Sequence, residues 1–156
     1  MRVQLCAVGR LRAGPERTLI DDYLSRFDKT GRALGLGPAS EVEVEDKKGG
    51  GIRAEADLLE RAVPAGALIC AMDERGKTMT SPEFAQRLAG WRDEGHRNVA
   101  FLIGGADGIA QDLRAKSNFK LSFGPMVWPH MLARVMLAEQ LYRACGILSG
   151  SPYHRP

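Results

Sequence analysis

The sequence has few cysteines and no long apolar run. Its three cysteines, Cys6, Cys70 and Cys145, are widely spaced, odd in number and without a CxxC pattern, which disfavours a disulfide framework and a zinc site. No stretch approaches the about 20 apolar residues of a transmembrane helix. The opening run, MRVQLCAVG, is too short for a signal peptide. We therefore expect a protein of the reducing cytoplasm, with small buried cysteines, no membrane contact and no metal.

Neither sign of charge dominates. The 22 basic and 19 acidic side chains give a formal net charge of +3, which is compatible with a nucleic-acid partner but does not establish one. Hydrophobic residues make up 44% of the chain and charged residues 26%, so the composition excludes a disordered protein and supports a real core. The length of 156 residues predicts one domain spanning residues 1–156.

Both common nucleotide-binding fingerprints are also missing. In LIGGADGI, Gly104 and Gly105 are adjacent and Gly108 follows, which differs from GxGxxG, and GxxxxGK[ST] occurs nowhere. Glycines in such a loop can let the backbone approach a ligand, or can serve only a tight turn. The spacing alone leaves both readings open.

Hydrophobic patterning predicts alternating strands and helices. Unbroken apolar runs indicate strands buried on both faces, and spacings of three and four residues indicate helices. The expected fold is α/β, a parallel sheet flanked by helices on both faces. Ser81 is the predicted N-cap of the third helix, with Pro82 at its first position. Strands are expected at residues 3–8, 41–45, 67–72, 99–103 and 119–123, and helices at 15–29, 52–63, 81–92, 109–117 and 129–148.

Three loops at the carboxyl ends of strands compete as a ligand site: residues 73–77, 104–108 and 123–128. The last is apolar yet interrupted by Pro125 and followed by Pro129, so it is not regular structure. Its free backbone groups would suit a flat heteroaromatic ring such as adenine. The alternative is a loop buried in the core. Residues 46–51, DKKGGG, are expected to form a surface loop or a mobile basic arm near RNA.

The last predicted helix is apolar on more than one face, which indicates two partners, its own sheet and another subunit. Glu139 and Arg143 are four residues apart and could form a surface pair. His130 lies at the helix N-terminus, where the dipole disfavours a charged imidazole. The tail residues Tyr153 and His154, with the arginine that follows, are a frayed end or an RNA contact set for stacking, proton transfer and phosphate binding.

Four motifs resemble one known family over essentially the whole chain. They are QLCAVGRL at residues 4–11, LIGGADGI at 102–109, LSF…WPHMLARVMLAEQLYRA at 121–144 and PYHRP at 152–156. In these motifs the chain resembles the RlmH family, the YbeA-type SPOUT methyltransferases. The resemblance implies methylation at N3 of a pseudouridine in large-subunit (23S) ribosomal RNA.

The resemblance also implies a fold, a cofactor and an assembly. It implies a deep C-terminal trefoil knot, a rare exception to the rule that chains do not thread loops. It implies a homodimer in which the tail of one subunit completes the site of the other, and S-adenosylmethionine as the cofactor. By motif match, the cofactor contacts are Met72, Gly104, Phe123, Gly124, Pro125, Met126, Val127 and Trp128.

The same match suggests roles in methyl transfer. A sulfonium donor is activated by its own charge, so the protein must position the acceptor and remove its proton. We predict His154 as the general base, with Arg143 or Arg155 stabilising negative charge on a carbonyl oxygen. Glu139 would orient Arg143 or act as the base, and Tyr153 would hold the target base. Further predicted substrate contacts are Arg134, Arg155 and His130.

A net charge of +3 is small for binding ribosomal RNA through phosphates alone. The assembled ribosome is therefore the expected substrate rather than naked RNA. Three alternatives stand beside this function: a SPOUT methyltransferase acting on another RNA such as a tRNA, a non-catalytic ribosome-binding factor, and a flavodoxin-like nucleotide binder, which the missing fingerprints disfavour.

Overall fold

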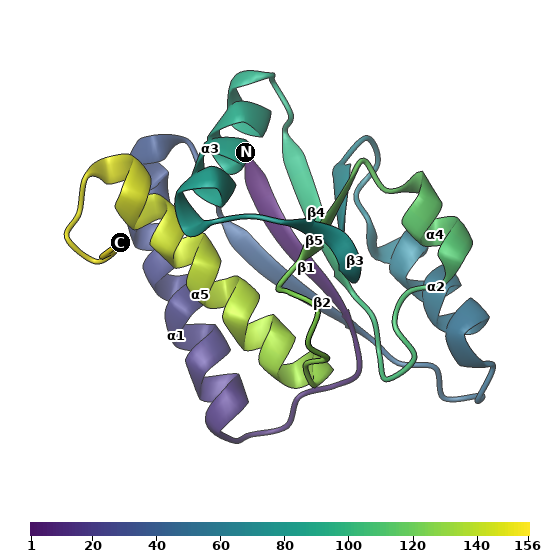
Figure 1. Cartoon of the computed structure of the whole chain (residues 1–156). Coiled ribbons are helices and arrows are strands. Elements are labelled where there is room, and N and C mark those ends of the chain that lie inside the picture. Colours follow the sequence, from purple (N-terminus) through teal and green to yellow (C-terminus); the bar gives the residue numbers. More distant parts are fainter.

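Five parallel strands form one sheet in the order β2-β1-β4-β3-β5 in the computed structural model, which describes residues 1–156 (Figure 1). This confirms the predicted parallel α/β architecture. The strands are β1 (Arg2–Val8), β2 (Ala39–Val44), β3 (Leu68–Thr78), β4 (Asn98–Ile103) and β5 (Phe119–Ser122).

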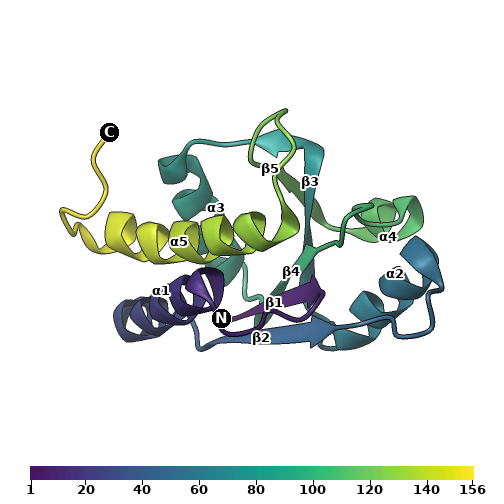
Figure 2. The same ribbon diagram turned by 90° about the horizontal axis from the view of Figure 1, so that it is seen from below.

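Helices cover both faces of the sheet, as predicted. One layer holds the first, third and last helices and the other holds the remaining two α-helices (Figures 1 and 2). None of the helices combines the length and the apolar character needed to cross a membrane. The helices are α1 (Pro15–Gly31), α2 (Gly51–Ala62), α3 (Ser81–Asp93), α4 (Gln111–Lys116) and α5 (His130–Ser149), with a short 3-10 helix at Arg32–Leu34.

The central strands are apolar on both faces because each face packs against a helical layer. In β1, Leu5 and Ala7 join the core under α1, α3 and α5, whereas Cys6 and Val8 join the core under α2 and α4. Successive strand residues point to opposite faces, so a strand covered twice needs an unbroken apolar run. This explains why the two central strands were predictable from sequence.

All three cysteines are buried and free, as expected of small core residues. Burial raises the pKa of the Cys6 thiol to about 11. Burial, with a smaller contribution from Asp28, raises that of Cys145 to about 12. These thiols therefore remain protonated near neutral pH and pack as apolar groups.

The start of α3 differs from the prediction by one residue. Thr80, not Ser81, is the N-cap: its hydroxyl accepts a hydrogen bond from the Glu83 backbone N–H at 3.2 Å. The Glu83 carboxylate in turn accepts from the Thr80 backbone N–H at 2.8 Å, completing a capping box. The predicted cap at Ser81 is wrong because this reciprocal pair outweighs the simpler signal of a serine before a proline.

Strand β3 is longer than predicted and pairs with β5 on both sides of an irregular segment. The sequence predicted a strand ending at Met72 and a loop after it, but pairing resumes at Lys77, and Leu121 is the partner of both residues. Between Met72 and Lys77 the β3 backbone packs closely against β5: a Cβ at Gly76 would lie 2.7 Å from the Lys120 carbonyl. The simple loop predicted here is wrong. This close passage of β5 through residues 72–77 is consistent with the expected C-terminal knot.

Candidate functional site

A cavity of about 400 Å³ lies where β4 and β5 end, beside the irregular middle of β3 that follows Met72. This edge is where ligands bind in parallel α/β sheets. All three loops named from the sequence contribute to it. Gly76, Lys77 and Pro125 do not line it. Of the predicted site residues, those that line the cavity are Met72, Gly104, Phe123, Gly124, Met126, Val127, Trp128 and His130.

The glycine loop after β4 is a tight turn that faces this cavity. The Gly108 N–H donates to the Gly105 carbonyl at 3.0 Å, and the two residues form an isolated antiparallel bridge. A Cβ at Gly104 would lie 2.4 Å from the Gly108 carbonyl oxygen, and Gly108 itself has φ +78°. The turn therefore requires glycine at both positions, and the absence of side chains leaves its backbone open to a ligand.

The apolar loop before α5 is exposed rather than buried. Met126 and Val127 are 70% and 81% exposed, and Trp128 is 41% exposed. The alternative that this loop belongs to the core is therefore wrong. Together with Met131 and Leu132 on the first turn of α5, these residues form an exposed apolar patch of the kind that marks an interaction surface.

Four residues predicted to act in catalysis gather at the other end of α5. The Arg143 Nε donates to Glu139 at 2.6 Å, and an Arg143 amino group lies 3.2 Å from His154 Nδ1. The Arg143 guanidinium also lies 4.8 Å from the centre of the Tyr153 ring, which packs at a tilted angle against Tyr142. The tail thus packs back on the helix instead of fraying. The exposed Arg155 has no ion pair.

The electrostatics of this tail cluster (Glu139, Arg143, Tyr153 and His154) keep two groups protonated. The hydrogen bond that Arg143 donates to Glu139 raises the pKa of Arg143 above its ordinary value. Burial raises the pKa of Tyr153, and the nearby Glu139 and Tyr23 raise it further. At neutral pH the cluster therefore offers a fixed positive charge and a phenolic hydroxyl that can donate a hydrogen bond.

One chain does not bring the tail cluster to the cavity. His130, which lines the cavity, is the first residue of α5, and Arg143 lies in its last two turns. At about 1.5 Å of rise per residue, the two are roughly 20 Å apart along the axis. Figure 2 shows α5 extending away from the loops, with the C-terminus beyond its far end.

Comparison with known proteins decides the family. The family model described as "Predicted SPOUT methyltransferase" matches residues 1–154. The chain belongs to the SPOUT methyltransferase family. The path of β5 past residues 72–77 fits this assignment, because SPOUT proteins carry the C-terminal knot that the sequence resemblance implied.

Relatives within the SPOUT family match over nearly the full chain. A protein of Dinoroseobacter shibae named ribosomal RNA large subunit methyltransferase H is 74% identical over 155 residues, 99% of either chain. A protein of the same name from Ruegeria sp. is 70% identical with the same coverage. The solved structure of a "probable methylase family protein" from Haemophilus influenzae shares the fold, with 12% identity, a TM-score of 0.51 and coverage of 99% of this chain and 70% of that one.

Arg134 was predicted to contact the RNA substrate, but its side chain is buried. Its side chain is 1% exposed and donates to Glu41 at 2.9 Å, to Glu43 at 2.6 Å and to the Gly9 carbonyl at 3.1 Å. These contacts of Arg134 connect the start of α5 to β2 and to the end of β1. The placement favours a structural role for Arg134 over the predicted contact with RNA.

The contacts of Arg134 also affect the ionisation of Glu43. Burial alone would raise the pKa of this carboxyl, but hydrogen bonds from the Leu11 backbone N–H and from Arg134, with the charges of Arg134 and Arg17, lower it overall. Glu43 therefore stays ionised well into the acidic range, and the junction between β2 and α5 depends on that charge.

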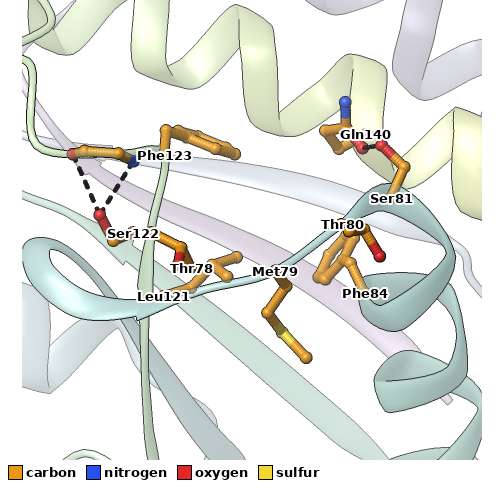
Figure 3. Close-up of a pocket in the computed structure, with 10 residues that line it drawn as sticks. Thr78, Met79, Thr80, Ser81, Phe84, Leu121, Ser122, Phe123 and Gln140 are labelled. Carbon is orange, nitrogen blue, oxygen red and sulfur yellow. Dashed lines mark hydrogen bonds between the residues drawn. The ribbon is translucent and has the colours of Figure 1, made fainter.

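Sequence reasoning missed a second, smaller cavity of about 240 Å³ beside the first (Figure 3). Phe123 and Gly124 line both, so this loop forms the wall between them. The Ser81 hydroxyl donates to Gln140 at 2.8 Å, which joins the start of α3 to α5 at its rim. No sequence signal links these two residues, because their proximity arises only from the packing of α3 on α5.

Sequence reasoning also missed Asp73, which lines the larger cavity. One oxygen of its carboxylate accepts from the backbone and side chain of Arg75 at 3.1 and 3.2 Å, and the other lies 3.0 Å from Arg114 Nε. Its position directly after the apolar run predicted as a strand, within a loop already named, was the one available signal.

Proposed function

We propose that this chain transfers a methyl group from S-adenosylmethionine to N3 of a pseudouridine in large-subunit ribosomal RNA. The observation that carries the proposal is the cavity beside the middle of β3 and the ends of β4 and β5, lined by residues that the motif match assigned to the cofactor. The names and near-complete coverage of the relatives support a large-subunit RNA substrate. The pseudouridine and its N3 atom rest on the family resemblance. We treat residues 1–156 as a single methyltransferase domain.

The lining of the cavity fits S-adenosylmethionine. Its volume is within the range of small-molecule sites, and its glycine turn and apolar loop expose backbone groups beside apolar side chains, as a nucleoside requires. The buried Asp73 carboxylate adds an acceptor. Met72, Gly104 and residues 123–128 would hold the cofactor, which supplies a methyl group activated by the sulfonium charge.

The tail cluster supplies the groups that the acceptor needs. Arginine has only donors, so His154 Nδ1 accepts from Arg143 in the structure. When a pseudouridine carbonyl oxygen takes over the Arg143 N–H groups, Nδ1 becomes free to remove the N3 proton. Arg143, oriented by Glu139, then stabilises the negative charge that develops on that oxygen. Tyr153 holds the base, Arg155 contacts phosphate, and His130 is a second-rank contact at the cavity.

A homodimer would unite the two halves of this site. The tail cluster and the cavity are roughly 20 Å apart along α5 in one chain, so a complete site needs the tail of a second chain. The exposed apolar patch at Met126, Val127, Trp128, Met131 and Leu132 offers a surface for that chain to cover.

The assembled ribosome is the proposed substrate, because a net charge of +3 per chain provides few phosphate contacts. An enzyme acting there works in the cytoplasm. Faster methylation of ribosomes than of naked RNA is expected, and equal rates on both would contradict this choice of substrate.

Two measurements test the function. Isothermal titration with S-adenosylmethionine should show saturable heat, whereas a non-catalytic ribosome-binding factor would show none. Methylation assays on ribosomes and on transfer RNA should then label only the large-subunit RNA. Labelling of transfer RNA alone would show that the chain is a SPOUT methyltransferase that acts on another RNA.

A further inference from the structure

Asp73 is a buried carboxylate in the wall of the larger cavity. It follows the first half of β3 directly, and its side chain is 7% exposed. Two arginines hold it: the largely exposed Arg75 on one oxygen and the mostly buried Arg114 near the other. Burying a charged carboxylate costs free energy, so its position inside the protein requires a specific explanation.

One oxygen of this carboxylate has no hydrogen bond. Asp73 Oδ2 is fully buried and lies 3.0 Å from Arg114 Nε, yet the N–H of that arginine is not aligned with it. The only other buried side-chain nitrogen or oxygen without a hydrogen bond is Nε of Arg134, and Arg134 does not line the cavity. Buried polar atoms are almost always paired, so an unpaired acceptor on a side chain that lines a cavity indicates a missing donor.

The two arginines determine which donor fits. Their positive charges outweigh the single negative charge of Asp73, so this carboxylate itself contributes little net attraction to a sulfonium or an ammonium group. The remaining property of Oδ2 is a free lone pair in a dry environment. A sugar hydroxyl is neutral and donates one hydrogen bond, and carboxylates at strand ends bind ribose hydroxyls in dinucleotide-binding folds.

We propose that Asp73 Oδ2 accepts a hydrogen bond from a ribose hydroxyl of the adenosine group bound in this cavity. This rests on the proposed function, namely that the cavity holds S-adenosylmethionine. It assigns a binding contact to a residue outside the positions matched to the family motifs.

The test compares ligands with and without the hydroxyl. Calorimetric affinities for S-adenosylhomocysteine and its 2′-deoxy and 3′-deoxy analogues are measured for the natural chain, Asp73→Asn and Asp73→Ala. The natural chain should bind one deoxy analogue roughly tenfold more weakly, the value for a hydrogen bond of about 1.4 kcal/mol to a charged group. This discrimination should shrink in Asp73→Asn, whose amide is a weaker acceptor, and vanish in Asp73→Ala.

A merely structural role would give a different pattern. If Asp73 only supports the loop, its variants weaken all three ligands by the same factor, and the proposal is overturned. Asp93→Asn is the matched control, because this exposed carboxylate also pairs with an arginine but lies outside the cavity, and it should preserve the discrimination. Thermal melting of each variant without ligand shows that the fold is retained.

Further outcomes distinguish a failure of the ribose contact from a failure of the proposed function. A selective loss of S-adenosylmethionine binding in Asp73→Asn, with S-adenosylhomocysteine unaffected, would assign the carboxylate to the cationic sulfur and overturn the ribose contact. If the natural chain binds neither ligand, the proposed function itself is wrong. Binding by the natural chain with unchanged discrimination in both variants would overturn only the role of Asp73.

Discussion

At the scale of the residue, the chemistry depends on how Arg143 divides its donors. In the free chain it contacts Glu139 and His154 at once, so the proposed base lies beside a positive charge until substrate arrives. The raised pKa of Arg143 means that this charge persists at any physiological pH. The cluster is thus prepared for a substrate oxygen that competes for the arginine.

Replacing His154 by alanine should slow the chemical step. A positioned general base contributes about 10²- to 10⁴-fold, so single-turnover methylation of ribosomes should fall by that range while the affinity for S-adenosylmethionine stays unchanged. His96→Ala, which alters a histidine paired with Glu94 on the surface, is the control and should leave the rate unchanged. An unaltered rate in His154→Ala would show that His154 is not the base.

Glu43 predicts a dependence of stability on pH. Its pKa is lowered in the folded chain, so its ionic contacts contribute fully above the unfolded value of about 4.3 and are lost as the pH falls through the lower folded value. Glu43→Gln should reduce the free energy of unfolding by about 1 to 3 kcal/mol at neutral pH. This deficit should shrink as the pH falls below about 4.

Denaturant titrations of both chains between neutral pH and about pH 3 measure this difference. Glu45→Gln, one residue beyond β2 and exposed, should change little across the range. A deficit for Glu43→Gln that stays constant with pH would refute a role for the ionised carboxylate.

At the scale of the element, the turn after β4 connects fold and site. Gly104→Ala would place a Cβ 2.4 Å from the Gly108 carbonyl, so the turn must open and its backbone must leave the cavity. The affinity for S-adenosylmethionine should fall roughly tenfold or more by calorimetry. Gly90→Ala, in α3 with open space around it, should bind normally. Normal binding by Gly104→Ala would remove this turn from the site.

Elements with a repeating pattern were predictable, and those built by distant contacts were not. The sequence of β1 and β4 predicts strands because two helical layers demand unbroken apolar runs. The extension of β3 was missed because residues 73–77 resemble a polar turn, and their pairing depends on β5, which comes more than 40 residues later.

The same division applies to the site. The loops could be named because strand ends in parallel sheets meet at one edge, and the glycine spacing pointed to the turn. The pairing of Asp73 with Arg114, the contact of Ser81 with Gln140 and the burial of Arg134 were not predictable. Each joins segments that are brought together only by the folded arrangement of helices and strands.

At the scale of the whole molecule, the separation of cavity and tail cluster predicts a site shared between subunits. Gly104→Ala weakens cofactor binding at the cavity and His154→Ala slows the chemical step at the tail, so each homodimer should have strongly reduced activity when S-adenosylmethionine is limiting. If the tail acts in trans, a mixed dimer keeps one intact site, built from the undamaged cavity of one chain and the undamaged tail of the other. Co-refolding the two chains should then restore roughly a quarter of the natural activity, since half the dimers are mixed and each has one working site.

Size-exclusion chromatography with light scattering on the same mixture verifies that dimers have formed. Activity that stays at background in mixed dimers would mean that each chain uses its own tail, which contradicts a shared site.

The central claim is that this chain methylates large-subunit ribosomal RNA. Mass spectrometry of nucleoside digests from large-subunit RNA tests it directly in cells that lack the gene, with and without the gene restored. The account predicts that a methylated pseudouridine nucleoside is absent from the deletion strain and returns on restoration. Identical spectra from the two strains would contradict the account.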